Sequence, residues 1–267
     1  MARTCIYCAA ETTMTGEHVF PNWINDLYPA AEVGETEVFN RLIAFGEPTV
    51  DRAYSKKDVA SLRTKFVCAS CNNGWMSALE DEARMVLIPL AKGERRTLSL
   101  HSQLVVATWA VKTFQIYETI WRRPPLSSAA DRTTVMRERR PSARSRVWAL
   151  AYDGTIGPLR ATYLVAEVSE PGRPAMGRAY LATFQLGCLV LQVAGADNGI
   201  ETGGGLATVG ERTPRRLQLF PPLPTLQWPP TEVLNDSCFI EATTETSIID
   251  RRIPVVSVPG LHDLPGR

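Results

Sequence analysis

The sequence predicts an α+β protein in which a small cysteine-rich module is followed by two core helices and a mainly antiparallel β-sheet. Three observations predict this order. Two Cys-x-x-Cys pairs stand in the first 71 residues, apolar residues recur at helical spacing between 77 and 123, and runs typical of strands follow. We therefore divide the chain into residues 1–95, 96–146 and 147–267.

The cysteine-rich module is defined by the pairs CIYC and CASC. Two residues between the thiolates let a tight turn direct both sulfur atoms at one cation, and two such pairs complete the four-sulfur shell that zinc prefers. A redox site would need one Cys-x-x-Cys in a βαβ setting, and disulfides are disfavoured because no secretory signal precedes the pairs. We predict one structural Zn²⁺ bound by Cys5, Cys8, Cys68 and Cys71, with a long insertion between the pairs.

Two helices are expected after the second pair. SALEDEARMVLIPLAKG (77–93) has an amphipathic pattern, and Pro89 is expected to end or kink this helix. LSLHSQLVVATWAVKTFQIYETIWRR (98–123) has apolar residues around most of its circumference, so we place it at the centre of the core. Two prolines stop it.

An arginine-rich connector follows the second helix. Such a run is usually a solvated face, and contact with nucleic-acid phosphates is the alternative. The candidates for that contact are Arg137, Arg139, Arg140 and Arg144. Beyond 147, runs such as RVWALAYDG and ATYLVAEV, separated by Gly and Pro turns, predict an antiparallel sheet. This third segment contains no catalytic constellation that we recognise.

The bulk composition excludes few functions. The net charge is +1, and 45% of the residues are apolar against 21% charged, so no overall electrostatic argument favours nucleic acid or a membrane surface. No apolar stretch reaches the ~18 residues of a membrane span. The start, MARTCIYCAAETT, has no apolar segment like that of a signal peptide. We expect a cytoplasmic protein with no membrane partner.

Two short motifs beside the cysteine pairs carry a resemblance. Glu17-His18-Val19-Phe20-Pro21 follows the first pair, and Asn72 directly follows the second. A Cys-x-x-Cys, then an acid–His–x–x–Pro motif, then a Cys-x-x-Cys-Asn that opens a helix resembles the four-cysteine form of the HNH (His-Me finger, ββα-metal) endonuclease family. The resemblance covers only residues 5–80. Where the family has a middle Asn, this chain has Arg63 nearest.

The resemblance implies a treble-clef-like (ββα-metal) module and a division of roles. His18 would be the general base that activates water, while Glu17 and Asn72 would hold a catalytic Mg²⁺ or Mn²⁺. The zinc would only fix the geometry. The substrate would be nucleic acid, with DNA favoured, and the biological setting a phage or a bacterial defence system.

Three functions remain open. The intact acid–His pair favours a metal-dependent endonuclease of the HNH type. The missing middle Asn favours a non-catalytic nucleic-acid-binding or regulatory protein on the same scaffold. In a third interpretation, the zinc module only stabilises the C-terminal domain, whose sheet carries an unrelated binding function.

Overall fold

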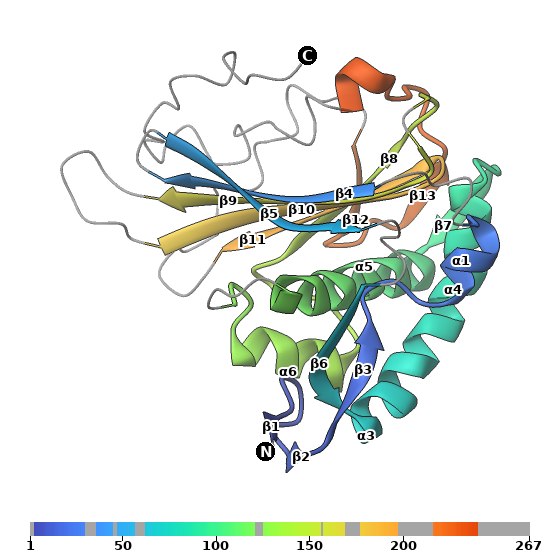
Figure 1. The fold of residues 1–267 in the computed structure, drawn as a ribbon. Helices are drawn as coiled ribbons and strands as arrows, with labels where there is room; N and C mark the ends of the chain where they lie inside the picture. The colour runs from blue at the N-terminus through green and yellow to red at the C-terminus, as the bar shows by residue number, and fades with distance from the viewer. Residues whose placement is uncertain are drawn as a thin grey trace.

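The computed structural model describes residues 3–29, 36–44, 47–56, 62–120, 125–155, 157–168, 177–196 and 216–239. It confirms the α+β class, with helices packed against a mostly antiparallel sheet (Figure 1). Among the described residues, no helix has the length and apolar character needed to cross a membrane.

The main sheet has seven strands in the order β12-β8-β11-β10-β9-β4-β5. All neighbours are antiparallel except β4 and β9, which pair in parallel from Phe39–Thr162 to Ile43–Ala166. The strands are β4 (Thr36–Ala44), β5 (Glu47–Lys56), β8 (Arg146–Ala151), β9 (Leu159–Val168), β10 (Gly177–Leu186), β11 (Leu189–Ala196) and β12 (Leu217–Phe220). The insertion between the cysteine pairs thus contributes β4 and β5 to the sheet that we expected from residues 147–267 alone.

Helix α5 (Leu100–Tyr117) packs against one face of this sheet (Figure 1). Its N-terminus is capped by Ser99, whose Oγ accepts a hydrogen bond from the Ser102 N–H at 3.1 Å. The Phe114 ring stacks on Tyr180 of β10 with centroids 4.3 Å apart. Almost every residue of the helix beyond its first turn is buried, as expected for a central helix. A 3₁₀ turn, η3 (Glu118–Ile120), continues it.

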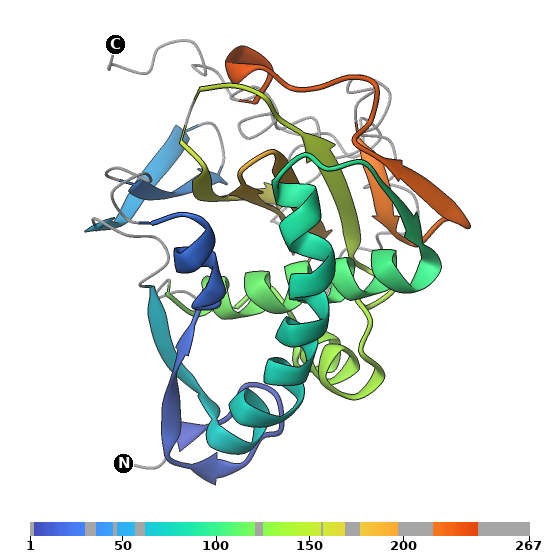
Figure 2. The ribbon, with the colours of Figure 1, turned by 90° about the vertical axis from the view of Figure 1, so that its right-hand side faces the viewer.

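Helix α4 (Ser77–Ala91) connects the cysteine module to the core and crosses α5 (Figure 2). Pro89 lies in the last turn of α4, where its missing N–H removes one helical hydrogen bond, and the helix ends two residues later at Ala91. Leu79, Ala83 and Leu87 form the buried stripe expected of an amphipathic helix.

Helix α6 (Ala129–Glu138) lies in the arginine-rich connector, for which we predicted no element. It begins with a capping box, in which the Ser128 Oγ accepts from the Asp131 N–H and the Asp131 carboxylate accepts from the Ser128 N–H. Arg139 ends it in the left-handed conformation, at a φ of 52°.

The cysteine module lies on the far side of α5 from the sheet (Figures 1 and 2). Strand β3 (Met14–His18) pairs antiparallel with β6 (Arg63–Cys68), and α3 (Ala69–Cys71) and η2 (Asn72–Met76) lead from β6 into α4. Smaller elements of the described fold include β1 (Arg3–Thr4), β2 (Glu11–Thr12), α1 (Trp23–Leu27), β7 (Arg96–Ser99) and β13 (Thr225–Trp228).

Candidate metal centre and the adjoining acid–histidine site

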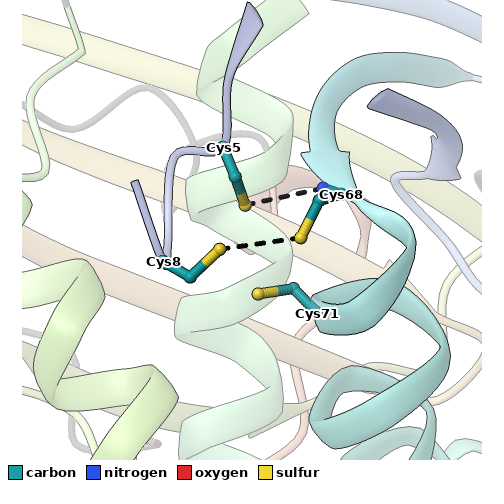
Figure 3. Close-up of side chains that lie close together, drawn as sticks. All are labelled: Cys5, Cys8, Cys68 and Cys71. Atoms are coloured by element: carbon teal, nitrogen blue, oxygen red, sulfur yellow. Dashed lines mark hydrogen bonds between the residues drawn. The ribbon is translucent and has the colours of Figure 1, made fainter. Parts of the chain in front are cut away.

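The four cysteines of the two pairs come together in one cluster, as predicted (Figure 3). Their sulfur atoms all lie within 4.8 Å of one another, and those of Cys8 and Cys68 are 3.6 Å apart. Four thiolates at ~2.3 Å from a tetrahedral zinc ion would be ~3.8 Å apart. None of them forms a disulfide. The cluster could therefore hold a metal ion such as zinc with little rearrangement.

Backbone amides prepare part of this cluster for a metal. Burial alone would raise the pKa of the Cys5 thiol, but hydrogen bonds from the backbone N–H groups of Cys8, Cys68 and Tyr7 lower it to about 7. Burial raises the pKa of the Cys8 and Cys71 thiols. Because only thiolates bind a metal tightly, a cation in the centre is what would favour the charged form of all four.

Aromatic and arginine side chains tie the first cysteine pair to the helices. The Tyr7 ring packs edge-on against Trp75 of η2, with centroids 4.9 Å apart. The Arg139 guanidinium lies over the Trp75 ring, 4.7 Å from its centroid. Arg132 of α6 donates from its Nε to the Ile6 carbonyl at 3.0 Å. The first cysteine pair is thus fixed both to η2 and to α6.

The acid–histidine pair lies at the end of β3. Glu17 is opposite Thr64 and His18 is opposite Arg63 in the antiparallel register, after an irregularity that follows Thr15. The His18 Nε2 accepts a hydrogen bond from the Arg63 Nε at 2.7 Å. Burial and the Arg63 charge lower the pKa of His18, so its imidazole is neutral at pH 7.

Glu17 points into the protein and meets Lys112, a residue that the motifs beside the cysteine pairs do not include. The Lys112 side chain is fully buried on α5, and its Nζ lies 2.5 Å from the Glu80 Oε1 of α4 and 3.9 Å from the Glu17 Oε1. Burial raises the pKa of Glu17 to about 7, although the Lys112 charge opposes this shift. The sequence indicates this contact only indirectly, through a lysine within an apolar helix, because a buried charge requires an oppositely charged partner.

Asn72, the third predicted site residue, contacts a different part of β3. Its Nδ2 donates to the Thr15 Oγ1 at 3.0 Å, and the Thr15 hydroxyl in turn donates to the Val67 carbonyl. This contact joins the start of η2 to the β3–β6 pair. A role for Asn72 as a metal ligand stays a prediction.

The four arginines proposed for phosphate contact lie at and after the end of α6. Arg140 pairs with Glu138 at 2.5 Å, and Arg144 pairs with Asp131 at 3.0 Å. Arg137 and Arg139 are exposed, the latter over Trp75. Neighbouring carboxylates thus offset part of the positive charge. Nucleic-acid contact at these residues also stays a prediction.

Comparison of the chain with models of protein families, with curated proteins and with solved structures gives no match. Function must therefore be argued from the geometry of the two sites.

Proposed function

We propose that this protein is a metal-dependent endonuclease of the HNH type, which hydrolyses phosphodiester bonds in nucleic acid with His18 as the general base. One observation carries the proposal. His18, which is neutral and partly exposed, lies next to the buried Glu17 carboxylate on β3. Strand β3 is joined through β6 and the cysteine cluster to the helical segment that leads into α4. The products would be a 5′-phosphate and a 3′-hydroxyl end if water attacks and the 3′ oxygen leaves.

The two carboxylates that meet at Lys112 are the proposed ligands of a hard divalent cation. Glu17 and Glu80 come from different elements and approach one positive charge, the Lys112 ammonium. Carboxylate oxygens are the ligands that Mg²⁺ and Mn²⁺ prefer. Glu17 and Glu80 would hold such an ion, with Asn72 as the further ligand that the family resemblance implies. When bound, the ion would stabilise the charge that develops on the phosphate and on the leaving oxygen.

His18 and Arg63 would act together on the substrate. A neutral imidazole can accept the proton of the attacking water. In the structure its Nε2 accepts from Arg63, so this nitrogen becomes available when the guanidinium turns away. A phosphodiester oxygen is a stronger partner for a guanidinium than a neutral imidazole is. Substrate binding at Arg63 would therefore release the base at the place where it is needed.

Zinc in the cysteine cluster would have no chemical role in this proposal. Four thiolates fill a tetrahedral shell and leave no position for water or substrate. Its effect would be on geometry, because Cys68 ends β6 and Cys71 ends α3, directly before η2 leads into α4. The cluster would hold Glu17 on β3 and Glu80 on α4 at a fixed separation.

One observation favours the second function, a non-catalytic nucleic-acid-binding or regulatory protein. The Lys112 ammonium already pairs with Glu80 and lies near Glu17, and the Asn72 amide is bonded to Thr15. A protein that keeps the scaffold only to bind nucleic acid would have no need of a vacant cation position. Cleavage assays separate the two functions directly.

The deciding test is nicking of supercoiled plasmid by zinc-loaded protein in Mn²⁺ or Mg²⁺, with His18→Ala as the variant. We expect the variant to be slower by roughly 100-fold or more, as for loss of a general base. His101→Ala is the matched control, because His101 is exposed and pairs with Glu82 on the surface of α4. Equal nicking by wild type and His18→Ala, or none by either, would refute the proposal.

A further inference from the structure

The charges around Lys112 form a cluster of three side chains from three separate elements. Lys112 lies on α5, Glu80 on α4 and Glu17 on β3. The lysine side chain has no exposed surface, and those of Glu80 and Glu17 are 21% and 7% exposed. A buried lysine in an apolar helix is costly unless carboxylates lie beside it, and here Glu80 and Glu17 supply them.

The geometry shows how unequally the two carboxylates share the ammonium. The Glu80 Oε1 is in direct hydrogen-bond contact at 2.5 Å, while the Glu17 Oε1 is 3.9 Å away, beyond a hydrogen bond. Two negative groups therefore share one positive charge, and Glu17 is the less neutralised of them. A second cation approaching Glu17 would meet the ammonium at short range.

We infer that Lys112 is a built-in cation that competes with a divalent ion for the Glu17 and Glu80 carboxylates, so that the ion binds only when Lys112 gives up at least one of them. This inference rests on the proposed function, in which the same carboxylates hold the catalytic ion. It makes Lys112 a positioning residue that keeps the carboxylates in place without metal and sets the affinity for the metal.

The test is binding of Mn²⁺ to the zinc-loaded full chain, followed by the paramagnetic resonance signal of the unbound ion. Lys112→Met removes the charge and keeps the length of the side chain. We expect it to bind Mn²⁺ roughly tenfold or more tightly than wild type, because the positive charge that competes for the same two carboxylates has been removed. Lys92→Met, at an exposed position just beyond α4, is the control and should bind as wild type does.

Two further variants keep the result decisive. Adding Glu80→Gln to Lys112→Met should abolish the gain, because one of the two ligands is lost. If the methionine variant does not fold, as judged by zinc content and circular dichroism, Lys112→Gln keeps a hydrogen-bond donor without the charge and should bind more tightly in the same way. Mn²⁺ affinity equal to or weaker than wild type in the folded variants would overturn the inference.

Failure of the inference can be told apart from failure of the proposed function. His18-dependent nicking by wild type, with no gain of Mn²⁺ affinity on loss of Lys112, would leave the nuclease standing and refute the competition. Tighter Mn²⁺ binding in Lys112→Met with no nicking by any variant would support the competition and refute the nuclease.

Discussion

Glu118 offers a quantitative test of the structure that is independent of any metal. It begins η3 directly after α5 and is almost fully buried. Its carboxylate accepts from the backbone N–H groups of Leu126 at 2.7 Å and Ser127 at 3.1 Å, and also from the Ser127 hydroxyl. The nearest cation, the Arg132 guanidinium, is 4.0 Å away. Burial outweighs these partners and raises the pKa of Glu118 to about 7.

The sign of the effect on stability follows from this shift. The folded protein holds the Glu118 proton up to about pH 7, whereas the unfolded chain releases it at the ordinary pKa of 4.5. Between these values the folded state binds more protons, so the free energy of unfolding falls as pH rises. For one group with these two pKa values, the loss between pH 5.5 and pH 7.5 is about 2 kcal/mol.

The assay compares urea unfolding of zinc-loaded wild type and Glu118→Gln at several pH values in that range. Glutamine keeps one acceptor oxygen, with two lone pairs, for the two backbone N–H groups and does not titrate. The variant should gain about 2 kcal/mol on wild type between pH 5.5 and pH 7.5. Burial also raises the pKa of Glu17 to about 7, and that contribution cancels because both proteins carry it. A stability difference that does not change with pH would refute the reasoning.

Two further predictions concern the cysteine module. Cys8→Ser should reduce bound zinc well below the one equivalent expected of wild type and unfold the module, since structural zinc contributes on the order of 10 kcal/mol to folding. The control Cys188→Ser lies outside the cluster and should retain full zinc. Metal analysis and circular dichroism distinguish the two variants. Asn72→Ala should weaken Mn²⁺ binding, because it removes the further ligand of the proposed site, and should cost about 1 kcal/mol in urea unfolding through loss of the bond to Thr15. Unchanged Mn²⁺ binding with reduced stability would instead make Asn72 a structural residue only.

Local patterns were sufficient to predict the parts of the fold that depend on local physics. The two helices were predicted because their apolar periodicity extends over many residues, and α4 and α5 begin within two residues of the expected positions. The four cysteines were predicted because the spacing within each pair fixes where both sulfur atoms point. Neither prediction required knowledge of what the segments contact.

The missed elements depend on weaker or longer-range signals. Helix α6 buries only Asp131 and Val135, so its apolar periodicity is faint, and its capping box at Ser128 was the stronger signal. Strands β4 and β5 join the sheet through a parallel pairing with β9, more than a hundred residues later in the chain. No local pattern encodes such a pairing, because it is set by the packing of the whole sheet.

The candidate site shows the same division between local and long-range information. A charged residue in the sequence AVKTF of a buried helix requires a carboxylate partner, so some ion pair at Lys112 could be expected from the sequence. Which of the 28 acidic residues supplies it depends on the fold. Met14 of β3 pairs with Cys68, and α4 follows Cys71 through η2, so the ends of both elements are fixed at the cysteine cluster. That cluster therefore sets the positions from which Glu17 and Glu80 reach Lys112, and a loss of metal there would disturb the charge pairing inside the core.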